Sequence, residues 1–178
     1  MGTLANRRRK KARPLRKWAR REEICCFRVY ERDIPEAPCV VDWYDGHAVV
    51  WASHRRRDET PEEREAWLGE VQAEVAEGLE IPPERVFLKE RRPGGQYRRE
   101  GAEAAEITVQ EGGLRFLVNL SDYHDTGLFP DHRLTRARVR AEASGARFLN
   151  LFCYTGSFTV YAAAGGAPST ESVDLSAT

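Results

Sequence analysis

Residues 147–178 read RFLNLFCYTGSFTVYAAAGGAPSTESVDLSAT, and this stretch decides the fold of the chain. Its first part, Arg147–Leu151, is a short apolar run that is long enough for a buried parallel strand. A loop closed by Gly156 follows, and Phe158–Ala164 carries the small and apolar residues of a helix that packs on a sheet. A second strand is expected over Glu171–Leu175. The stretch therefore predicts the first strand–loop–helix–strand unit of a Rossmann-like α/β domain.

The helix of this unit ends at a glycine pair, and an acid after the second strand indicates a nucleoside site. Gly165 and Gly166 end the helix, because glycine adopts the left-handed conformation there without a steric cost. Asp174 stands at the carboxyl end of the second strand, where an acid accepts hydrogen bonds from a ribose in sheets of this kind. The chain stops soon after this strand, so we expect half of a nucleoside-binding site in an incomplete domain.

The loop after the first strand distinguishes between the ligands that such a unit binds, namely NAD, FAD or S-adenosylmethionine. A dinucleotide loop has the pattern G-x-G-x-x-G, in which the glycines allow the backbone to approach a pyrophosphate. Phe152 and Tyr154 stand where the first two glycines would lie, and their rings crowd out a pyrophosphate. S-adenosylmethionine has no phosphate, and its sulfonium cation tolerates aromatic surroundings. The loop favours S-adenosylmethionine; the alternative is that both rings pack in the core of the domain.

The charges of the chain are unevenly distributed, although the formal net charge is zero. Ten Lys or Arg residues and no acid lie between Arg7 and Arg21, with Trp18 among them. Such a segment favours contact with RNA phosphates and base stacking on the tryptophan; the alternative is a solvated charged face. Trp43 and Trp51 are interpreted as sheet residues rather than base platforms. The residues expected to contact RNA are Arg7, Arg8, Arg9, Lys10, Lys11, Arg16, Lys17 and Arg20.

Several classes of protein are disfavoured by the sequence. No apolar run approaches the roughly 20 residues of a membrane helix, and the basic N-terminus lacks the apolar core of a signal peptide. The four cysteines show no C-x-x-C spacing and are too few for a disulfide framework in a chain of 178 residues. A His- and Asp-rich stretch at residues 122–132 matches no compact metal motif and is interpreted as a polar linker. We therefore expect a cytoplasmic, reduced protein without a metal or a membrane partner.

Upstream of residue 121 the pattern predicts a compact α+β domain. Asp45-Gly46 is a hairpin signal, Thr60-Pro61 begins a helix that runs to about Glu77, and Gly112-Gly113 joins a second hairpin. The expected strands are Cys25–Tyr30, Cys39–Tyr44, Ala48–Ala52, Val86–Lys89, Ile107–Val109 and Leu114–Leu120. Together they predict an antiparallel sheet with one covering helix. A further helix is expected over His132–Ala143, before the first parallel strand.

Two longer motifs resemble a known family. The sequence N-L-F-C-Y-T-G-S-F at residues 150–158, with V-D-L-S at residues 173–176, resembles the cofactor motif of class I S-adenosylmethionine-dependent 23S rRNA methyltransferases. The sequence N-L-S-D-Y-H-D-T-G-L-F-P-D-H-R at residues 119–133 is similar to the guanine-N7 half of bifunctional 23S rRNA guanine methyltransferases, as is the basic N-terminal region. The resemblance covers nearly the whole chain.

This resemblance implies a cofactor site for S-adenosylmethionine. In the family the residues around Gly156 surround the cofactor, the acid after the second strand holds the ribose, and the D-H-R element lies beside the site. The cofactor-binding residues so implied are Asp131, Arg133, Asn150, Phe152, Tyr154, Thr155, Gly156 and Asp174. For Arg133 the alternative is a salt bridge at the start of a helix. Cys153 stands where serine is usual, Pro130 departs from the family's F-L-D-H-R pattern, and the D-P-P element of the target-base pocket is absent.

The function implied is S-adenosylmethionine-dependent methylation of guanine N7 in large-subunit (23S) ribosomal RNA. Guanine N7 has a free lone pair, so the transfer needs no general base, and no catalytic residue is assigned. The chain is expected to be an N-terminal fragment, inactive alone, with a basic arm and helix (residues 1–22), an α+β RNA-binding or accessory domain (residues 23–120) and the start of the methyltransferase domain (residues 121–178).

Two other classes of function stay open on the sequence. One is a non-catalytic RNA-binding module with a vestigial nucleotide half-site. The other is a dinucleotide oxidoreductase, which the missing glycines disfavour. In either case, a two-stranded parallel unit leaves strand edges unpaired, so we expect exposed edges and apolar faces after residue 147 and greater stability before residue 120.

Overall fold

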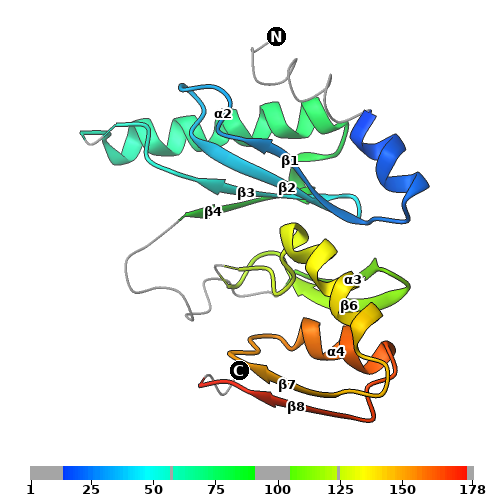
Figure 1. Cartoon of the computed structure of the whole chain (residues 1–178). Helices are drawn as coiled ribbons and strands as arrows, with labels where there is room; N and C mark the ends of the chain where they lie inside the picture. The colour runs from blue at the N-terminus through cyan, green and yellow to red at the C-terminus, as the bar shows by residue number, and fades with distance from the viewer. Residues whose placement is uncertain (1–13, 57, 91–104, 124, 176–178) are drawn as a thin grey trace.

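The computed structural model describes residues 14–56, 58–90, 105–123 and 125–175. Its elements are β1 (Cys26–Glu31), β2 (Cys39–Tyr44), β3 (His47–Ala52), α2 (Pro61–Leu79), η1 (Pro83–Arg85), β4 (Val86–Glu90), β5 (Glu106–Glu111), β6 (Leu114–Asn119), η2 (Pro130–His132), α3 (Arg133–Glu142), β7 (Arg147–Leu151), α4 (Ser157–Ala164) and β8 (Ser169–Val173). A four-stranded sheet with α2 lies at one end of the molecule, β7 and β8 lie at the other, and α3 and β6 lie between them (Figure 1).

The first sheet has the strand order β1-β2-β3-β4. Strands β1, β2 and β3 are antiparallel neighbours, and Asp45 and Gly46 both adopt positive φ angles (38° and 91°), as a two-residue hairpin requires. Strand β4 runs parallel to β3, because α2 carries the chain back to the end of the sheet at which β3 begins. Strands β5 and β6 pair only with each other among the described strands. The predicted single antiparallel sheet is therefore wrong: the sheet is mixed, and the second hairpin is separate from it.

Helix α2 begins where the sequence predicted. The Thr60 hydroxyl accepts a hydrogen bond from the backbone N–H of Glu63, and the Glu63 carboxylate accepts one from the backbone N–H of Thr60. The helix continues through Gly78 to Leu79, two residues beyond its predicted end. Trp67, with Val71 and Val75 of the same helix, is buried against one face of the first sheet. That contact forms the larger apolar core of the molecule.

The opposite face of the first sheet is covered by the β5–β6 hairpin and the segment that follows it. Cys26, Tyr44 and Val49 of the sheet pack against the apolar residues Val109, Val118, Leu120 and Leu128. The Tyr44 hydroxyl donates to the carbonyl oxygen of Leu128 at 3.1 Å and accepts from the Thr126 hydroxyl at 2.9 Å. Residues 120–128 are thus fixed to the sheet by both apolar and polar contacts.

The N-terminal helical segment, residues 14–21, packs its apolar side on this sheet. Ala19 is buried, Leu15 and Trp18 are half-buried, and the Trp18 ring packs edge-on against Phe27 at 6.4 Å. The segment is thus part of the larger apolar core.

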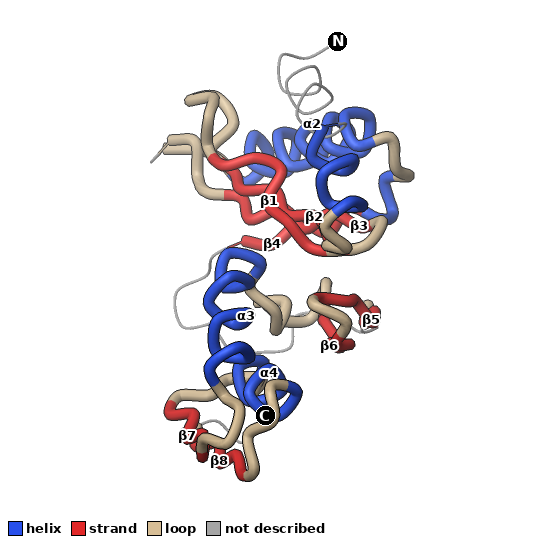
Figure 2. The backbone as a smooth tube through the Cα atoms, turned by 45° about the vertical axis from the view of Figure 1, so that its right-hand side comes forward, coloured by secondary structure: helices blue, strands red, loops and turns tan. Residues whose placement is uncertain are grey.

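The unit at the C-terminal side has the predicted order of strand, helix and strand. Strands β7 and β8 are parallel, and α4 lies beside α3 (Figure 1 and Figure 2). Strand β8 begins and ends two residues earlier than predicted. The apolar faces expected to be exposed after residue 147 are confirmed, because Leu149 and Leu151 are 56% and 57% exposed, and Val173 of β8 is also exposed. Strand β7 has the sequence of a buried strand but pairs with only one described strand, and its leucines are not covered in the described chain.

Candidate functional site

The turn between β7 and α4 has an unusual backbone. Phe152, Tyr154 and Gly156 all have left-handed φ angles of 57°, 52° and 73°, and two of these residues carry side chains that disfavour that region. The backbone N–H of Cys153 donates to the carbonyl oxygen of Val173 at 3.2 Å. The turn is therefore bent across the carboxyl end of β8.

Asp174 fixes this turn directly. It lies one residue beyond β8, and its carboxylate oxygen Oδ2 accepts a hydrogen bond of 2.7 Å from the backbone N–H of Tyr154. The two features that the sequence singled out, the turn and the acid, are thus in contact although 20 residues separate them in the chain. An acid at the carboxyl end of a parallel strand occupies the position from which ribose hydroxyls are bound in sheets of this kind.

The two aromatic rings of the turn lie at the surface. Phe152 is 88% exposed and Tyr154 is 38% exposed, so the alternative in which both rings pack in the core is wrong. The Tyr154 ring lies 5.7 Å from that of Phe129. The His132 ring in turn lies 6.0 Å from both Phe129 and Phe158. These contacts attach the turn to η2 and to the start of α4.

Two polar side chains at the turn have structural partners. The Thr155 hydroxyl donates to the carbonyl oxygen of Gly127 at 2.6 Å, and a Cβ atom on Gly127 would lie only 3.3 Å from the Thr155 methyl group. The Asn150 amide donates to the Thr159 hydroxyl at 2.9 Å, which itself shares a hydrogen bond of 2.7 Å with Ser172. Asn150 and Thr155 therefore hold the turn in place.

Two residues of the D-H-R element lie toward the first sheet and the N-terminal helical segment. Asp131 lines a cavity against the first sheet, and the Arg133 guanidinium lies 5.1 Å from the centre of the Trp18 ring. Of the three residues of this element, His132 is the one whose ring reaches Phe158 at the start of α4. The contact between Arg133 and Trp18 is a cation–π contact rather than the salt bridge considered for it, and a role of Asp131 and Arg133 toward the cofactor stays a prediction.

The residues expected to contact RNA fall into two groups. Arg7, Arg8, Arg9, Lys10 and Lys11 lie outside the described residues. Arg16 has a structural role, since it donates to the carbonyl oxygen of Leu79 and lies 4.3 Å from the Trp43 ring; its burial lowers the pKa of the guanidinium. Lys17 and Arg20 are exposed.

The sequence did not predict a buried ion pair that joins the elements around the site. The Arg136 guanidinium donates to both carboxylate oxygens of Glu111 at 2.7 and 2.8 Å, and these side chains are 1% and 2% exposed. The Tyr161 hydroxyl donates to the same carboxylate at 2.9 Å. The pair joins β5 to α3 and α4. A charged residue on a helix is usually solvated, so no local signal distinguished Arg136 from its neighbours.

Two further searches concern metals and membranes. In the described parts of the chain, no three His, Cys, Asp or Glu side chains gather in the way that a metal ion requires. Of the helices that the structure describes, none combines the length and the apolar character needed to cross a membrane.

Comparison with known proteins identifies the family. A sequence profile of the S-adenosylmethionine-dependent methyltransferases matches residues 32–178, and the chain belongs to this family. Its cofactor is S-adenosylmethionine. The described residues fit this group: the turn exposes an aromatic ring at Phe152, a Cβ atom on Gly156 would meet nothing within 4 Å, and the Asp174 carboxylate lies against the same turn.

The relatives give the comparison its detail. The chain is 50% identical to a protein of Pseudomonas putida F1 and 49% identical to one of Pseudomonas entomophila L48, each named ribosomal RNA large subunit methyltransferase K/L. These alignments cover 98% of this chain and 24% of each relative, so the chain spans about a quarter of the length of the curated relatives it matches.

Two solved structures share the fold. One is a SAM-dependent methyltransferase of Streptococcus mutans, with a TM-score of 0.73 and 24% identity over 98% of this chain and 45% of that chain. The other is SMU.776, a methyltransferase complexed with SAH, with a TM-score of 0.68 and 23% identity over 99% of this chain and 46% of that chain. The likeness shows a methyltransferase fold with mixed β-sheet and helices.

Proposed function

We propose that this chain supplies the cofactor-binding turn of an enzyme that methylates guanine N7 in 23S ribosomal RNA. The observation that carries the proposal is the contact of 2.7 Å between the Tyr154 backbone N–H and the Asp174 carboxylate, because an acid beside an exposed aromatic turn can bind a ribose. The names of the curated relatives support ribosomal RNA of the large subunit as the substrate, and an RNA substrate of this kind implies a cytoplasmic location.

Each residue of the turn has a role in this proposal. Asp174 accepts hydrogen bonds from the ribose while it holds the Tyr154 N–H. Phe152 offers its exposed ring as a stacking surface, and Gly156 leaves space beside the turn. Asn150 keeps β7 and α4 in register through Thr159, so the turn keeps its shape when no ligand is present. The bound cofactor supplies a methyl group on a cationic sulfur.

Guanine N7 is the acceptor that best suits this chain. It presents a lone pair in the unprotonated base, so no residue has to remove a proton before the methyl group is transferred. The work of the protein is then to align the two reactants and to exclude water. No described residue is assigned as a general acid or base on this account.

We propose further that the described residues do not methylate RNA by themselves. The apolar side chains of Leu149, Leu151 and Val173 are about half exposed, and Leu175 is fully exposed, so the sheet around the turn has no cover in the described chain. A target-base pocket that excludes water requires such a cover. The proposed division has a basic arm and helix at residues 1–22, an accessory RNA-binding domain at 23–120 and methyltransferase sequence from 121 onward.

Calorimetry with S-adenosylhomocysteine on the full-length protein tests the cofactor site. Asp174→Ala should weaken binding by about 10- to 100-fold, the loss expected for hydrogen bonds to a charged group. Glu171→Ala is the matched control, because Glu171 is an exposed acid on β8 itself, and it should change the affinity by less than about twofold. Absence of binding by the full-length protein, or equal losses in both variants, would refute the site.

The position of methylation needs a second measurement. The full-length protein should transfer a radiolabelled methyl group to unmodified 23S rRNA, and the RNA chain should then break at that guanine after borohydride reduction and aniline treatment. Labelled RNA that resists this cleavage would overturn N7 as the acceptor. RNA binding without any transfer would favour the alternative of a non-catalytic RNA-binding module.

A further inference from the structure

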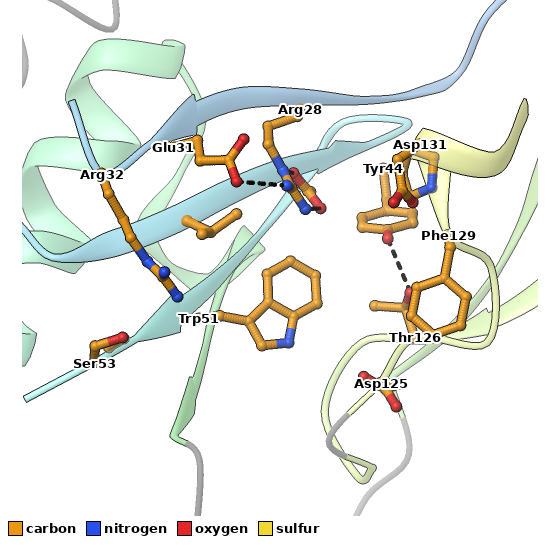
Figure 3. A pocket seen from close by; sticks show the side chains of 14 residues that line it. Arg28, Glu31, Arg32, Tyr44, Trp51, Ser53, Asp125, Thr126, Phe129 and Asp131 are labelled. Atoms are coloured by element: carbon orange, nitrogen blue, oxygen red, sulfur yellow. Dashed lines mark hydrogen bonds and ion pairs between the residues drawn. The ribbon is translucent and has the colours of Figure 1, made fainter.

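A cavity of about 370 Å³ lies on the face of the first sheet that is opposite to α2. It opens between β1, β2 and β3 and residues 125–131, and its volume falls within the range of small-molecule sites (Figure 3). Its lining combines aromatic rings with charged side chains. Of the residues predicted to bind the cofactor, Asp131 alone lines this cavity.

Aromatic rings reach the cavity from two different elements. Trp51, half-buried, projects from β3, and Phe129, 39% exposed, projects from the segment before η2 (Figure 3). The Tyr44 ring is held behind them by its hydrogen bond with Thr126. Half-exposed indole and phenyl faces are the surfaces on which nucleobases stack, and such stacking tolerates any base. The rings therefore fit a flat heterocycle but do not choose between bases.

The charged groups of the cavity distinguish between the bases. Asp42 is buried, and its carboxylate accepts hydrogen bonds from Arg28 at 2.9 and 3.3 Å; Arg28 also pairs with Glu31 at 3.2 Å. Asp125 and Asp131 add two more carboxylates, whereas Arg32 is the remaining cation. Acids outnumber cations in the lining, so the interior disfavours a phosphate and favours a group that donates hydrogen bonds.

Guanine is the base whose edge matches this lining. Its Watson–Crick edge presents the N1–H and the N2 amino group side by side, and a carboxylate accepts from both. Arg32 has a left-handed φ of 47° and lies exposed, where it can meet the phosphate attached to a bound base. Base and phosphate would thus meet groups of the appropriate charge.

The cavity is close to the candidate cofactor site. Phe129 lines the cavity, and the same ring lies 5.7 Å from that of Tyr154 in the turn. Phe129 therefore connects the cavity with the turn. This placement is useful to an enzyme that must hold an RNA strand next to its cofactor.

We infer that the cavity binds a guanine base of single-stranded RNA, stacked on Trp51 with its donor edge toward Asp125 and its phosphate near Arg32. The inference deepens the proposed function and rests on it for the choice of RNA as the ligand. It also revises the expectation that Trp51 is only a sheet residue.

Fluorescence anisotropy with three labelled nine-nucleotide RNAs tests the inference on the full chain. One RNA is all uridine, one has a central guanine, and one has a central inosine, which lacks the 2-amino group. The guanine RNA should bind most tightly. Trp51→Ala should weaken its binding by about tenfold, the lower part of the range for stacking on an aromatic side chain. Trp51→Phe should retain most of the affinity.

Two further variants separate base recognition from folding and from charge. Trp43→Ala is the matched control, since Trp43 packs in the core on the opposite face of the sheet, and it should preserve the ratio of guanine to uridine affinity. Asp125→Asn replaces a half-exposed side chain and should abolish the preference for guanine over inosine. Both cavity variants should leave the slope of affinity against salt unchanged, whereas Lys17→Ala should reduce it.

The outcomes decide the inference in either direction. Equal binding of the guanine and uridine RNAs by the unmodified chain overturns it, and so does a guanine preference that survives both Trp51→Ala and Asp125→Asn. If Trp51→Ala fails to fold by circular dichroism, the Asp125→Asn result decides alone. A guanine preference that the cavity variants abolish, in a protein that does not bind S-adenosylhomocysteine, would refute the proposed function and support the cavity assignment. Binding of S-adenosylhomocysteine without any guanine preference would support the cofactor site and refute the cavity assignment.

Discussion

The buried pair of Glu111 and Arg136 should be the most sensitive point of the fold. Arg136 donates to both oxygens of Glu111 at 2.7 and 2.8 Å and to the carbonyl oxygen of Phe129 at 2.8 Å, while Tyr161 donates to Glu111 at 2.9 Å. The carboxylate of Glu111, on β5, thus accepts hydrogen bonds from one residue of α3 and one residue of α4. The Glu111→Ala variant removes the acceptor for all of them.

The size of the effect follows from burial. The two charged side chains are 1% and 2% exposed, so the variant leaves a guanidinium charge without its partner in a water-free environment. Breaking a buried pair in this way costs about 3–5 kcal/mol, and an unsatisfied hydroxyl at Tyr161 costs about 1–3 kcal/mol. The two costs overlap, so they do not add in full. We expect about 4 kcal/mol in the free energy of unfolding, which shifts the urea midpoint by about 2 M at a typical slope.

Urea denaturation followed by circular dichroism measures this loss. Glu142→Ala is the matched control, because Glu142 makes an ion pair of 2.8 Å with Arg138 on the surface of α3, where the side chains are 64% and 79% exposed. The control should lose less than about 0.5 kcal/mol. Replacing both buried partners, as Glu111→Leu with Arg136→Met, should cost less than Glu111→Ala alone. A Glu111→Ala midpoint as high as that of Glu142→Ala would refute the reasoning.

Three further predictions concern stability. Thr60→Ala removes the cap of α2 and should cost about 1 kcal/mol by urea denaturation, whereas Thr60→Ser should retain the cap; equal losses would contradict it. Gly165→Ala would place a Cβ atom 2.2 Å from the carbonyl oxygen of Arg140, so α3 and α4 must separate, at about 1–3 kcal/mol; an unchanged melting temperature would contradict that contact. Burial raises the pKa of the Tyr44 hydroxyl well above its ordinary value of 10.0. Above pH 10 the unfolded chain loses this proton and the folded chain keeps it, so the free energy of unfolding should fall by about 1.4 kcal/mol per pH unit, and a slope as steep in Tyr44→Phe would exclude this cause.

Local signals predicted most of the elements. Asp45-Gly46 and Gly112-Gly113 both adopt the paired positive φ angles of two-residue hairpins, and the Thr60-Pro61 pair begins α2 as predicted. The direction of β4 was not predictable in this way. It depends on α2 crossing one face of the sheet, which is a tertiary arrangement rather than a property of the residues Val86–Glu90.

The candidate site, like the fold, could be predicted only in part. The turn and Asp174 follow from strand ends and one glycine, and the structure brings them together. The support of the site could not be predicted, because it comes from contacts between distant segments. Thr155 binds Gly127, and Arg133 lies against Trp18 at the other end of the sequence. The apolar sequence of β7 predicted burial, but burial also requires neighbouring elements that cover both faces of the strand.

A crystal structure of the full-length protein with S-adenosylhomocysteine would test the central claim most directly. The account predicts the nucleoside against residues 152–156, with its ribose hydroxyls on the Asp174 carboxylate and with Phe152 in contact with the ligand. A ligand bound elsewhere, or Phe152 and Tyr154 buried with no space beside them, would contradict it.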